Sequence, residues 1–264
     1  MTRASTRPTG IGAAGQGRPA VSGAQVQRME EPAVDSRIAP ALRDRIGAWL
    51  RGSRLAAGLE LLSVPLLLAL RSAGVLRNPS LVLLLLGWLS LWLRRSGWRQ
   101  AGLARPAHWP RTVLAALLIG ITYDVLDLRV LVPLLHRLTG EPLDLAQFTP
   151  LRGNVGALLM WLGVTWTFAA FGEEMAWRGY VLGRLGEMFG RGARGAALNV
   201  ALVGVAFGFA HGTQGVTGVL DNVLAGLLFS ALCLATGGNL WLPILVHGVV
   251  DTTSFALLFL GVHP

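Results

Sequence analysis

Seven stretches of this sequence are apolar over about the length that a helix needs to cross a membrane, which is roughly 20 residues. They lie near residues 55–71, 79–94, 112–134, 160–183, 196–214, 219–236 and 240–260. The second stretch is short and charged residues interrupt the third, so an eighth helix or a re-entrant segment stays open. The sequence therefore predicts an all-α, polytopic membrane protein with about seven, or eight, transmembrane helices.

The composition agrees with a membrane protein and argues against a nucleic-acid partner. Hydrophobic residues make up 53% of the chain and charged residues 14%, whereas about a quarter of a soluble domain is charged. The net charge of +9 comes from arginines that cluster between the apolar stretches, as membrane topology requires. We therefore expect the lipid bilayer as the partner of this chain. The absence of lysine indicates a GC-rich coding sequence and hence a prokaryotic source.

Outside the apolar stretches, the chain divides by composition. Residues 1–37 are rich in Gly, Ala, Ser, Pro and Arg and contain no signal peptide, which predicts a disordered cytoplasmic tail. Residues 38–54 alternate apolar residues with arginines and are interpreted as an amphipathic helix at the membrane surface. Residues 55–264 form the predicted transmembrane domain, in which segment 140–154 is interpreted as an exposed loop.

The distribution of arginine predicts the orientation of the chain. With the N-terminus inside, 18 of the 23 arginines lie in inside segments, and cytoplasmic segments are the ones enriched in arginine. We therefore expect a cytoplasmic N-terminus in a prokaryotic cytoplasmic membrane. Cys233 is the only cysteine, so an intramolecular disulfide and a cysteine-based zinc site are excluded. Its apolar surroundings favour a small core residue over a nucleophile.

Ionisable side chains within the last apolar stretches are the strongest indication of function, because burying them in a membrane is costly. Glu173, Glu174 and Arg178 lie in stretch 160–183. Glu174 and Arg178 are four residues apart, so they share a helix face and can form an ion pair. Glu173 lies about 100° further round the helix and can point elsewhere.

Two later stretches carry histidines at the same spacing. His211 follows Phe207 by four residues, and His247 precedes Asp251 by four. Each feature alone has a structural interpretation, as an ion pair, a buried histidine or a hydrogen bond. Their occurrence together on the last four apolar stretches favours a functional site. The remaining polar residues of the apolar stretches are interpreted as interfacial, namely Asp124, Asp127, Asp221 and Asn222.

This set of side chains suits the hydrolysis of a peptide bond inside the bilayer. Burial favours the neutral form of a carboxyl group and a nearby arginine favours its charged form, so a glutamate can be poised as a general base. Histidines can donate to a developing oxyanion. One glutamate and two histidines are also the ligands of many catalytic zinc sites, so Glu173, His211 and His247 are candidate ligands of a zinc ion. Cofactor use, either none or zinc, stays open.

The three motifs resemble a known family when they are taken in order. They read EExxxR at 173–178, FxxxH at 207–211 and HxxxD at 247–251. In this order on late apolar helices they resemble the CAAX-processing and bacteriocin-processing (CPBP, or Abi) intramembrane proteases, over about residues 160–260. The resemblance implies an all-helical membrane fold with a catalytic cavity that opens within the bilayer.

The resemblance also implies roles for the residues. Glu173 would activate the attacking water with the help of His211, and His247 and Asp251 would stabilise the tetrahedral intermediate. Glu174, Arg178 and Phe207 would support the site without reacting. Both a metal-dependent and a glutamate-dependent mechanism are associated with the family. We favour the glutamate mechanism, in which Glu173 is the base.

The predicted function is an intramembrane endopeptidase that acts on a membrane-tethered protein or peptide. A non-catalytic partner or bacteriocin-immunity protein of the same fold is the first alternative, and a proton-coupled transporter is the second. The chain shows no inverted repeat of the kind that many transporters have. The oligomeric state is not predicted. The predicted depths of the two histidines in the membrane conflict. His211 falls late in stretch 196–214 and His247 early in stretch 240–260, so a shared site requires tilted helices or shifted boundaries.

Overall fold

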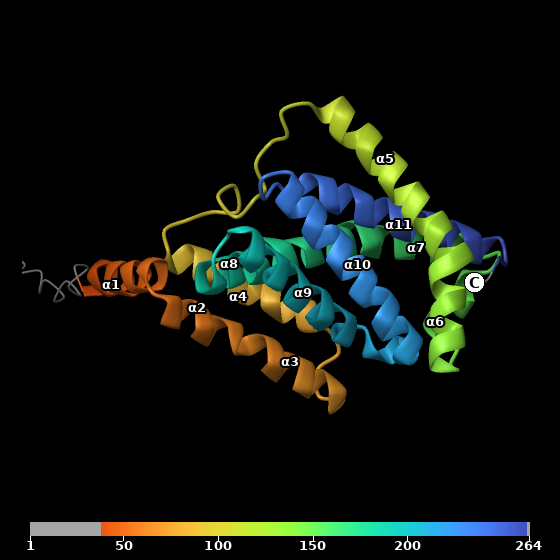
Figure 1. The fold of residues 1–264 in the computed structure, drawn as a ribbon, viewed down its shortest axis with the longest axis horizontal. Helices are drawn as coiled ribbons and strands as arrows, with labels where there is room; N and C mark the ends of the chain where they lie inside the picture. The colour runs from red at the N-terminus through yellow and green to blue at the C-terminus, as the bar shows by residue number, and fades with distance from the viewer. Residues whose placement is uncertain (1–37, 263–264) are drawn as a thin grey trace, which may run out of the picture. The chain divides into compact units, whose positions relative to one another are not determined.

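The computed structural model describes residues 38–262, and these form helices, most of them joined by short connections; the connections 94–108, between α4 and α5, and 140–154, between α6 and α7, are longer (Figure 1). The α-helices are α1 (Ile38–Gly52), α2 (Arg54–Leu61), α3 (Ser63–Ser72), α4 (Pro79–Leu93), α5 (Trp109–Leu126), α6 (Val132–Thr139), α7 (Val155–Val164), α8 (Leu182–Phe189), α9 (Ala193–Ala210), α10 (Gly215–Ala235) and α11 (Trp241–Phe259). No β-strand occurs in this part of the chain, which confirms the all-α class. The predicted disordered tail, residues 1–37, lies outside the described residues.

Among the described residues, five helical stretches are long and apolar enough to cross a membrane. They are Arg54–Ser72, Val155–Phe189, Ala193–Ala210, Gly212–Ala235 and Trp241–Phe259. Helix α4 is apolar but has only 15 residues, and the stretch from α5 to α6 is not among the five. The polytopic membrane architecture is confirmed, while seven or eight spans remain a prediction.

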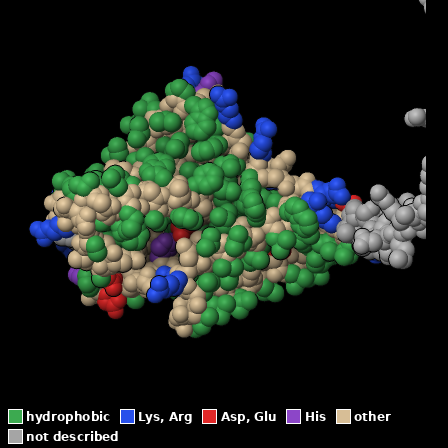
Figure 2. All heavy atoms as spheres, turned by 180° about the vertical axis from the view of Figure 1, so that it is seen from behind, with side chains coloured by type: hydrophobic (Ala, Val, Ile, Leu, Met, Phe, Trp, Pro, Cys, Tyr) green, Lys and Arg blue, Asp and Glu red, His purple; other side chains and the backbone are tan. Residues whose placement is uncertain are grey.

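The surface of the described residues is largely apolar, as expected for side chains that face lipid. Figure 2 shows green side chains over most of the visible face, with arginines gathered at a few places. Large residues such as Leu85, Leu118 and Leu159 are more than half exposed, each on a different helix. A soluble protein rarely exposes continuous apolar surface of this extent, so this chain is an integral membrane protein.

One long helix runs from Val155 to Phe189 and is longer than the predicted stretch 160–183. The side chain of Asn154 accepts a hydrogen bond from the Ala157 N–H at 3.0 Å and thereby caps the first turn. The helix ends at Gly190, whose φ of +89° a residue with a Cβ rarely adopts. Its middle is formed by two π-helical segments, η3 (Thr165–Glu173) and η4 (Met175–Val181), which the sequence pattern did not predict.

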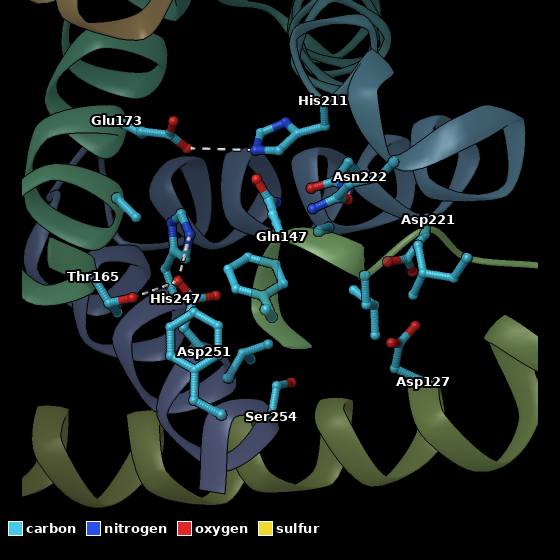
Figure 3. A pocket seen from close by; sticks show the side chains of 18 of the residues that line it. Asp127, Gln147, Thr165, Glu173, His211, Asp221, Asn222, His247, Asp251 and Ser254 are labelled. Atoms are coloured by element: carbon cyan, nitrogen blue, oxygen red, sulfur yellow. Dashed lines mark hydrogen bonds and ion pairs between the residues drawn. The ribbon is translucent and has the colours of Figure 1, made fainter. Parts of the chain in front are cut away.

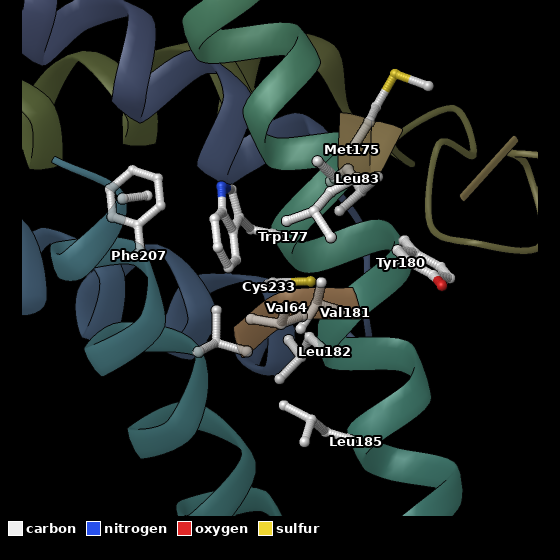
Figure 4. Close-up of a cluster of buried hydrophobic side chains, with 14 of the residues drawn as sticks. Val64, Leu83, Met175, Trp177, Tyr180, Val181, Leu182, Leu185, Phe207 and Cys233 are labelled. Carbon is white, nitrogen blue, oxygen red and sulfur yellow. The ribbon is translucent and has the colours of Figure 1, made fainter. Parts of the chain in front are cut away.

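The main hydrophobic core lies where η4 meets α4 and α9 (Figure 4). Trp177 is fully buried against Phe207, with ring centroids 5.8 Å apart, and its indole N–H donates to Ser80 at 2.9 Å. Cys233 is buried in the same cluster, which confirms its interpretation as a core residue.

Helices α9 and α10 approach each other through small residues, as membrane helices commonly do. A Cβ added to Gly226 would lie 2.9 Å from the Cα of Gly204, so a larger residue at either position would force the helices apart. This close approach brings the end of α9 next to the start of α10, where His211 lies.

A buried charge network around Arg94, which directly follows α4, joins the N-terminal helices to the end of the long helix. Its guanidinium binds Glu60 of α2 at 2.5 Å and Glu187 of α8 at 3.1 Å, and only 3% of the Arg94 side chain is exposed. Arg51 of α1 donates to the Arg94 carbonyl at 2.5 Å. In the sequence, Arg94 is only one of the 18 arginines that predict the orientation, whereas in the structure it lies between helices and binds two glutamates.

Candidate functional site

The π-helical middle of the long helix positions both adjacent glutamates. A π-helix closes its hydrogen bonds between residues i and i+5. Such segments are rare in proteins as a whole, and those that occur are often found at functional sites. Glu173 ends η3 with 13% of its side chain exposed, whereas the Glu174 side chain is fully buried. The two carboxyl groups therefore face different surroundings, as their spacing around the helix predicted.

Glu174 forms the predicted ion pair with Arg178. The Arg178 Nη1–H donates to Glu174 Oε1 at 2.8 Å, and neither side chain has any exposed surface. Arg178 also donates from Nη2 to the Gly226 carbonyl at 3.1 Å and from Nε to the Ser230 hydroxyl at 3.3 Å. This pair lies within protein on all sides, so it cannot contact a substrate and instead fixes its neighbours.

The neighbour that Glu174 fixes is His247 of α11. His247 Nδ1 lies 2.9 Å from Glu174 Oε1, which accepts the Nδ1–H. The imidazole is stacked on the ring of Phe229, with centroids 4.8 Å apart and an angle of 20° between the planes. One hydrogen bond and one stacking contact thus hold the ring, and its other nitrogen is left facing the cavity.

That second nitrogen faces Asp251 (Figure 3). His247 Nε2 lies 3.7 Å from Asp251 Oδ2, and the Thr165 hydroxyl donates to the same oxygen at 3.3 Å. The predicted shared face of His247 and Asp251 is therefore present. Thr165 belongs to η3, so the two ends of this contact come from the long helix and from α11.

Glu173 and His211 face each other across the same cavity. His211 Nε2 lies 4.0 Å from Glu173 Oε2, and 24% of the histidine side chain is exposed. His211 Nδ1 lies 2.9 Å from the Phe207 carbonyl oxygen. A carbonyl oxygen can only accept, so the hydrogen is on Nδ1, and in the neutral ring Nε2 has a lone pair that points toward Glu173.

The predicted conflict of depth between the two histidines is explained by helix ends. Helix α9 ends at Ala210, one turn before the predicted boundary at 214, and His211 begins a short turn that leads to Gly215. The Phe207 ring lies between the histidines, 4.6 Å from the ring centroid of His211 and 6.3 Å from that of His247. Both histidines therefore reach one cavity, although they lie at different distances from the ends of their helices.

The cavity has a volume of about 370 Å³ and is also lined by polar residues outside the three motifs. One of them is Gln147, which belongs to segment 140–154; most residues of this segment are exposed, in agreement with its interpretation as an exposed loop. Asp127 and Asp221 line the part of the cavity away from Glu173, and Asn222 lies nearer to His211 (Figure 3). Their interfacial position in the membrane stays a prediction. Asp124 also lines the cavity, and it is buried and accepts a 2.6 Å hydrogen bond from Ser254. For the three aspartates, the signal that could have identified them is the one that identified Glu173, an acidic group within an apolar stretch; Gln147 carries no such signal.

The side chains that were candidate zinc ligands do not converge on one point. Within residues 38–262, no three His, Cys, Asp or Glu side chains lie close enough together to hold a metal ion. Glu173, His211 and His247 border one cavity, but His247 is bound to Glu174 on one side and faces Asp251 on the other. This arrangement does not fit a three-ligand zinc site.

Comparison with known proteins assigns the part of the chain that carries this cavity. Residues 155–253 match the family model described as type II CAAX prenyl endopeptidase Rce1-like. This segment is an Rce1-like domain of the CPBP family. It contains all seven residues of the three motifs, from Glu173 to Asp251. Neither the curated proteins nor the solved structures contain a significant match to the chain.

The Rce1-like domain accounts for the long helix and for α9, α10 and most of α11. The description of this family model, a type II CAAX prenyl endopeptidase, agrees with the resemblance seen in the sequence. Helices α1 to α6 lie outside the matched residues. Nevertheless α4 packs on the long helix and α5 on α11, so these helices support the domain.

Proposed function

We propose that this chain is an intramembrane endopeptidase in which Glu173 activates the water that attacks a peptide bond. The observation that carries the proposal is the arrangement of Glu173 and His211, whose Oε2 and Nε2 atoms face each other at 4.0 Å on the cavity wall. Both atoms accept hydrogen bonds when the carboxyl group is ionised and the imidazole is neutral.

Their separation suits one water molecule. With a hydrogen-bond length of about 2.8 Å to each atom, the angle at the water oxygen is about 90°, close to the angle between the two O–H bonds of water. Such a water directs its protons to Glu173 and His211 and its lone pairs into the cavity. A general base in this position is worth about 10² to 10⁴ in rate.

The proposed reaction then follows from these positions. As the water oxygen bonds to the scissile carbonyl carbon, its proton passes to Glu173 and the carbonyl electron pair moves onto oxygen. A proton held between His247 Nε2 and Asp251 is donated toward this oxyanion. The C–N bond then breaks, and Glu173 returns its proton to the leaving nitrogen. Glu174 and Arg178 position His247 and take no part in proton transfer.

The steps of this mechanism use only side chains of the chain and one water molecule. The proposed substrate is a membrane-tethered protein or peptide, since the cavity is formed between helices whose outer faces are apolar. We place the chain in a prokaryotic cytoplasmic membrane with a cytoplasmic N-terminus, on the basis of its arginine distribution.

The proposal is tested by comparing the native host carrying the wild-type chain with the same host carrying Glu173→Gln. Membrane-bound and secreted peptides are compared by mass spectrometry, and Glu141→Gln, on an exposed loop residue, is the matched control. We expect some peptides to be processed in the wild type and the control but not in Glu173→Gln. Identical peptides in all three strains would overturn the catalytic proposal and favour a non-catalytic partner or immunity protein.

A further inference from the structure

Gln147 is a polar residue of the cavity that none of the three motifs contains. It lines the cavity, and its side chain points toward the Glu173–His211 pair (Figure 3). The residue is exposed to the cavity rather than enclosed by protein. Its amide group is therefore open to whatever the cavity holds, next to the position proposed for the attacking water.

The segment that carries Gln147 is fixed on both sides of it. Gln147 lies in the short 3-10 helix η2 (Ala146–Leu151), which begins where Asp144 Oδ1 accepts a hydrogen bond from the Ala146 N–H at 2.9 Å. Leu151, at the other end, is fully buried.

The residue next to Gln147 anchors this segment to the helices that carry the site. The ring centroid of Phe148 lies 4.9 Å from that of Trp161 in α7 and 5.1 Å from that of Phe255 in α11. Helix α7 leads into Glu173, and α11 carries His247. Gln147 is therefore held relative to both parts of the site, as a substrate-positioning group must be.

The chemistry of the side chain indicates what it binds. A carboxamide has two N–H donors and one carbonyl acceptor and carries no charge. The backbone of an extended chain presents N–H donors and carbonyl acceptors. A single carboxamide can therefore accept a hydrogen bond from a backbone N–H and donate one to a backbone carbonyl.

From these observations we infer that Gln147 is a positioning residue, which binds a backbone peptide group of the substrate next to the scissile bond. The inference rests on the proposed endopeptidase function. If Gln147 has this role, its hydrogen bonds to the substrate backbone are present both in the enzyme–substrate complex and in the transition state. Loss of these hydrogen bonds therefore raises KM and leaves kcat nearly unchanged.

The test uses purified full-length protein in lipid nanodiscs and a pool of synthetic peptides that carry an alkyl anchor. Cleavage is followed by mass spectrometry, and the best-cleaved peptide is resynthesised with single backbone N–H groups replaced by ester oxygens on either side of the scissile bond. Wild type, Gln147→Ala and Thr149→Ala are compared. Thr149 lies in the same 3-10 helix and does not line the cavity, so it controls for changes in the segment itself.

We expect Gln147→Ala to lower kcat/KM by about tenfold through KM, the scale of one or two lost hydrogen bonds. One ester substitution should lower kcat/KM of the wild type and of Thr149→Ala by a similar factor but have little effect on Gln147→Ala. Unchanged kinetics in Gln147→Ala, or equal ester effects in all three proteins, would overturn the inference while leaving the endopeptidase proposal intact. No cleavage by the wild type would overturn both.

Discussion

The buried ion pair of Glu174 and Arg178 allows a quantitative prediction. Replacing Arg178 by Met removes hydrogen bonds to Glu174, to the Gly226 carbonyl and to Ser230, and leaves a carboxylate with no exposed surface without its counter-ion. Breaking one partner of a buried pair costs about 3–5 kcal/mol, most of it from the remaining uncompensated charge. Arg178→Met should therefore lower stability by about this amount.

The double variant Glu174→Met/Arg178→Met separates the charge effect from the packing effect. When both charges are removed, most of the loss should be recovered, because apolar residues of similar volume commonly replace buried pairs with little cost. Activity should not recover, since His247 Nδ1 has lost the carboxylate that orients the ring. Stability and activity thus respond differently to the same pair of substitutions.

Unfolding of the purified proteins in detergent, followed by tryptophan fluorescence during a thermal or denaturant ramp, measures these effects. Arg194→Ala, at an exposed arginine, is the control and should be close to the wild type. Glu174→Met is measured alone as the second single variant. The reasoning is refuted if the stability losses of Arg178→Met and Glu174→Met add in the double variant, because residues in one ion pair must couple. It is also refuted if the double variant regains full activity.

Three further predictions follow from other parts of the structure. Arg94→Ala should lower stability by about 1.5–3 kcal/mol, the scale of a charged hydrogen bond, with little change in kcat, as denaturant unfolding and peptide cleavage would show. A Cβ at Gly248 would lie 2.5 Å from the Trp166 ring, so Gly248→Ala should lower the free energy of unfolding by about 1–3 kcal/mol through overpacking. Because the substitution moves the adjacent His247, kcat should fall further than the loss of folded protein explains. Treatment with EDTA or 1,10-phenanthroline should leave cleavage unchanged, and elemental analysis should find no stoichiometric metal; loss of activity that zinc restores would contradict the glutamate mechanism.

The sequence predicted the ion pair, the His247–Asp251 contact and the membrane fold for simple physical reasons. Charged groups within apolar stretches are expensive, so they are rarely without a partner, and a spacing of four residues places two side chains on one helix face. These arguments depend only on local geometry, and the structure agrees with both contacts.

Other features depend on long-range packing and could not be read from local patterns. The π-helical segments around Glu173 have nine and seven residues, which is too short for a hydrophobic period of their own to be recognised in the sequence. Segment 140–154 is polar both because it is a loop and because Gln147 lines a cavity, and composition cannot distinguish these causes. Arg94 has the same sequence context as arginines that face water, and only the positions of Glu60 and Glu187 make it a buried network.

The most direct test of the account is cleavage of the anchored peptide pool in H2¹⁸O by wild type and Glu173→Gln in nanodiscs. The account predicts that the wild type places one ¹⁸O atom in the new carboxyl group, because water attacks the peptide carbonyl. It predicts that Glu173→Gln cleaves at least about 100-fold more slowly while its unfolding midpoint is unchanged. Cleavage by Glu173→Gln at the wild-type rate would contradict the claim that Glu173 is the base.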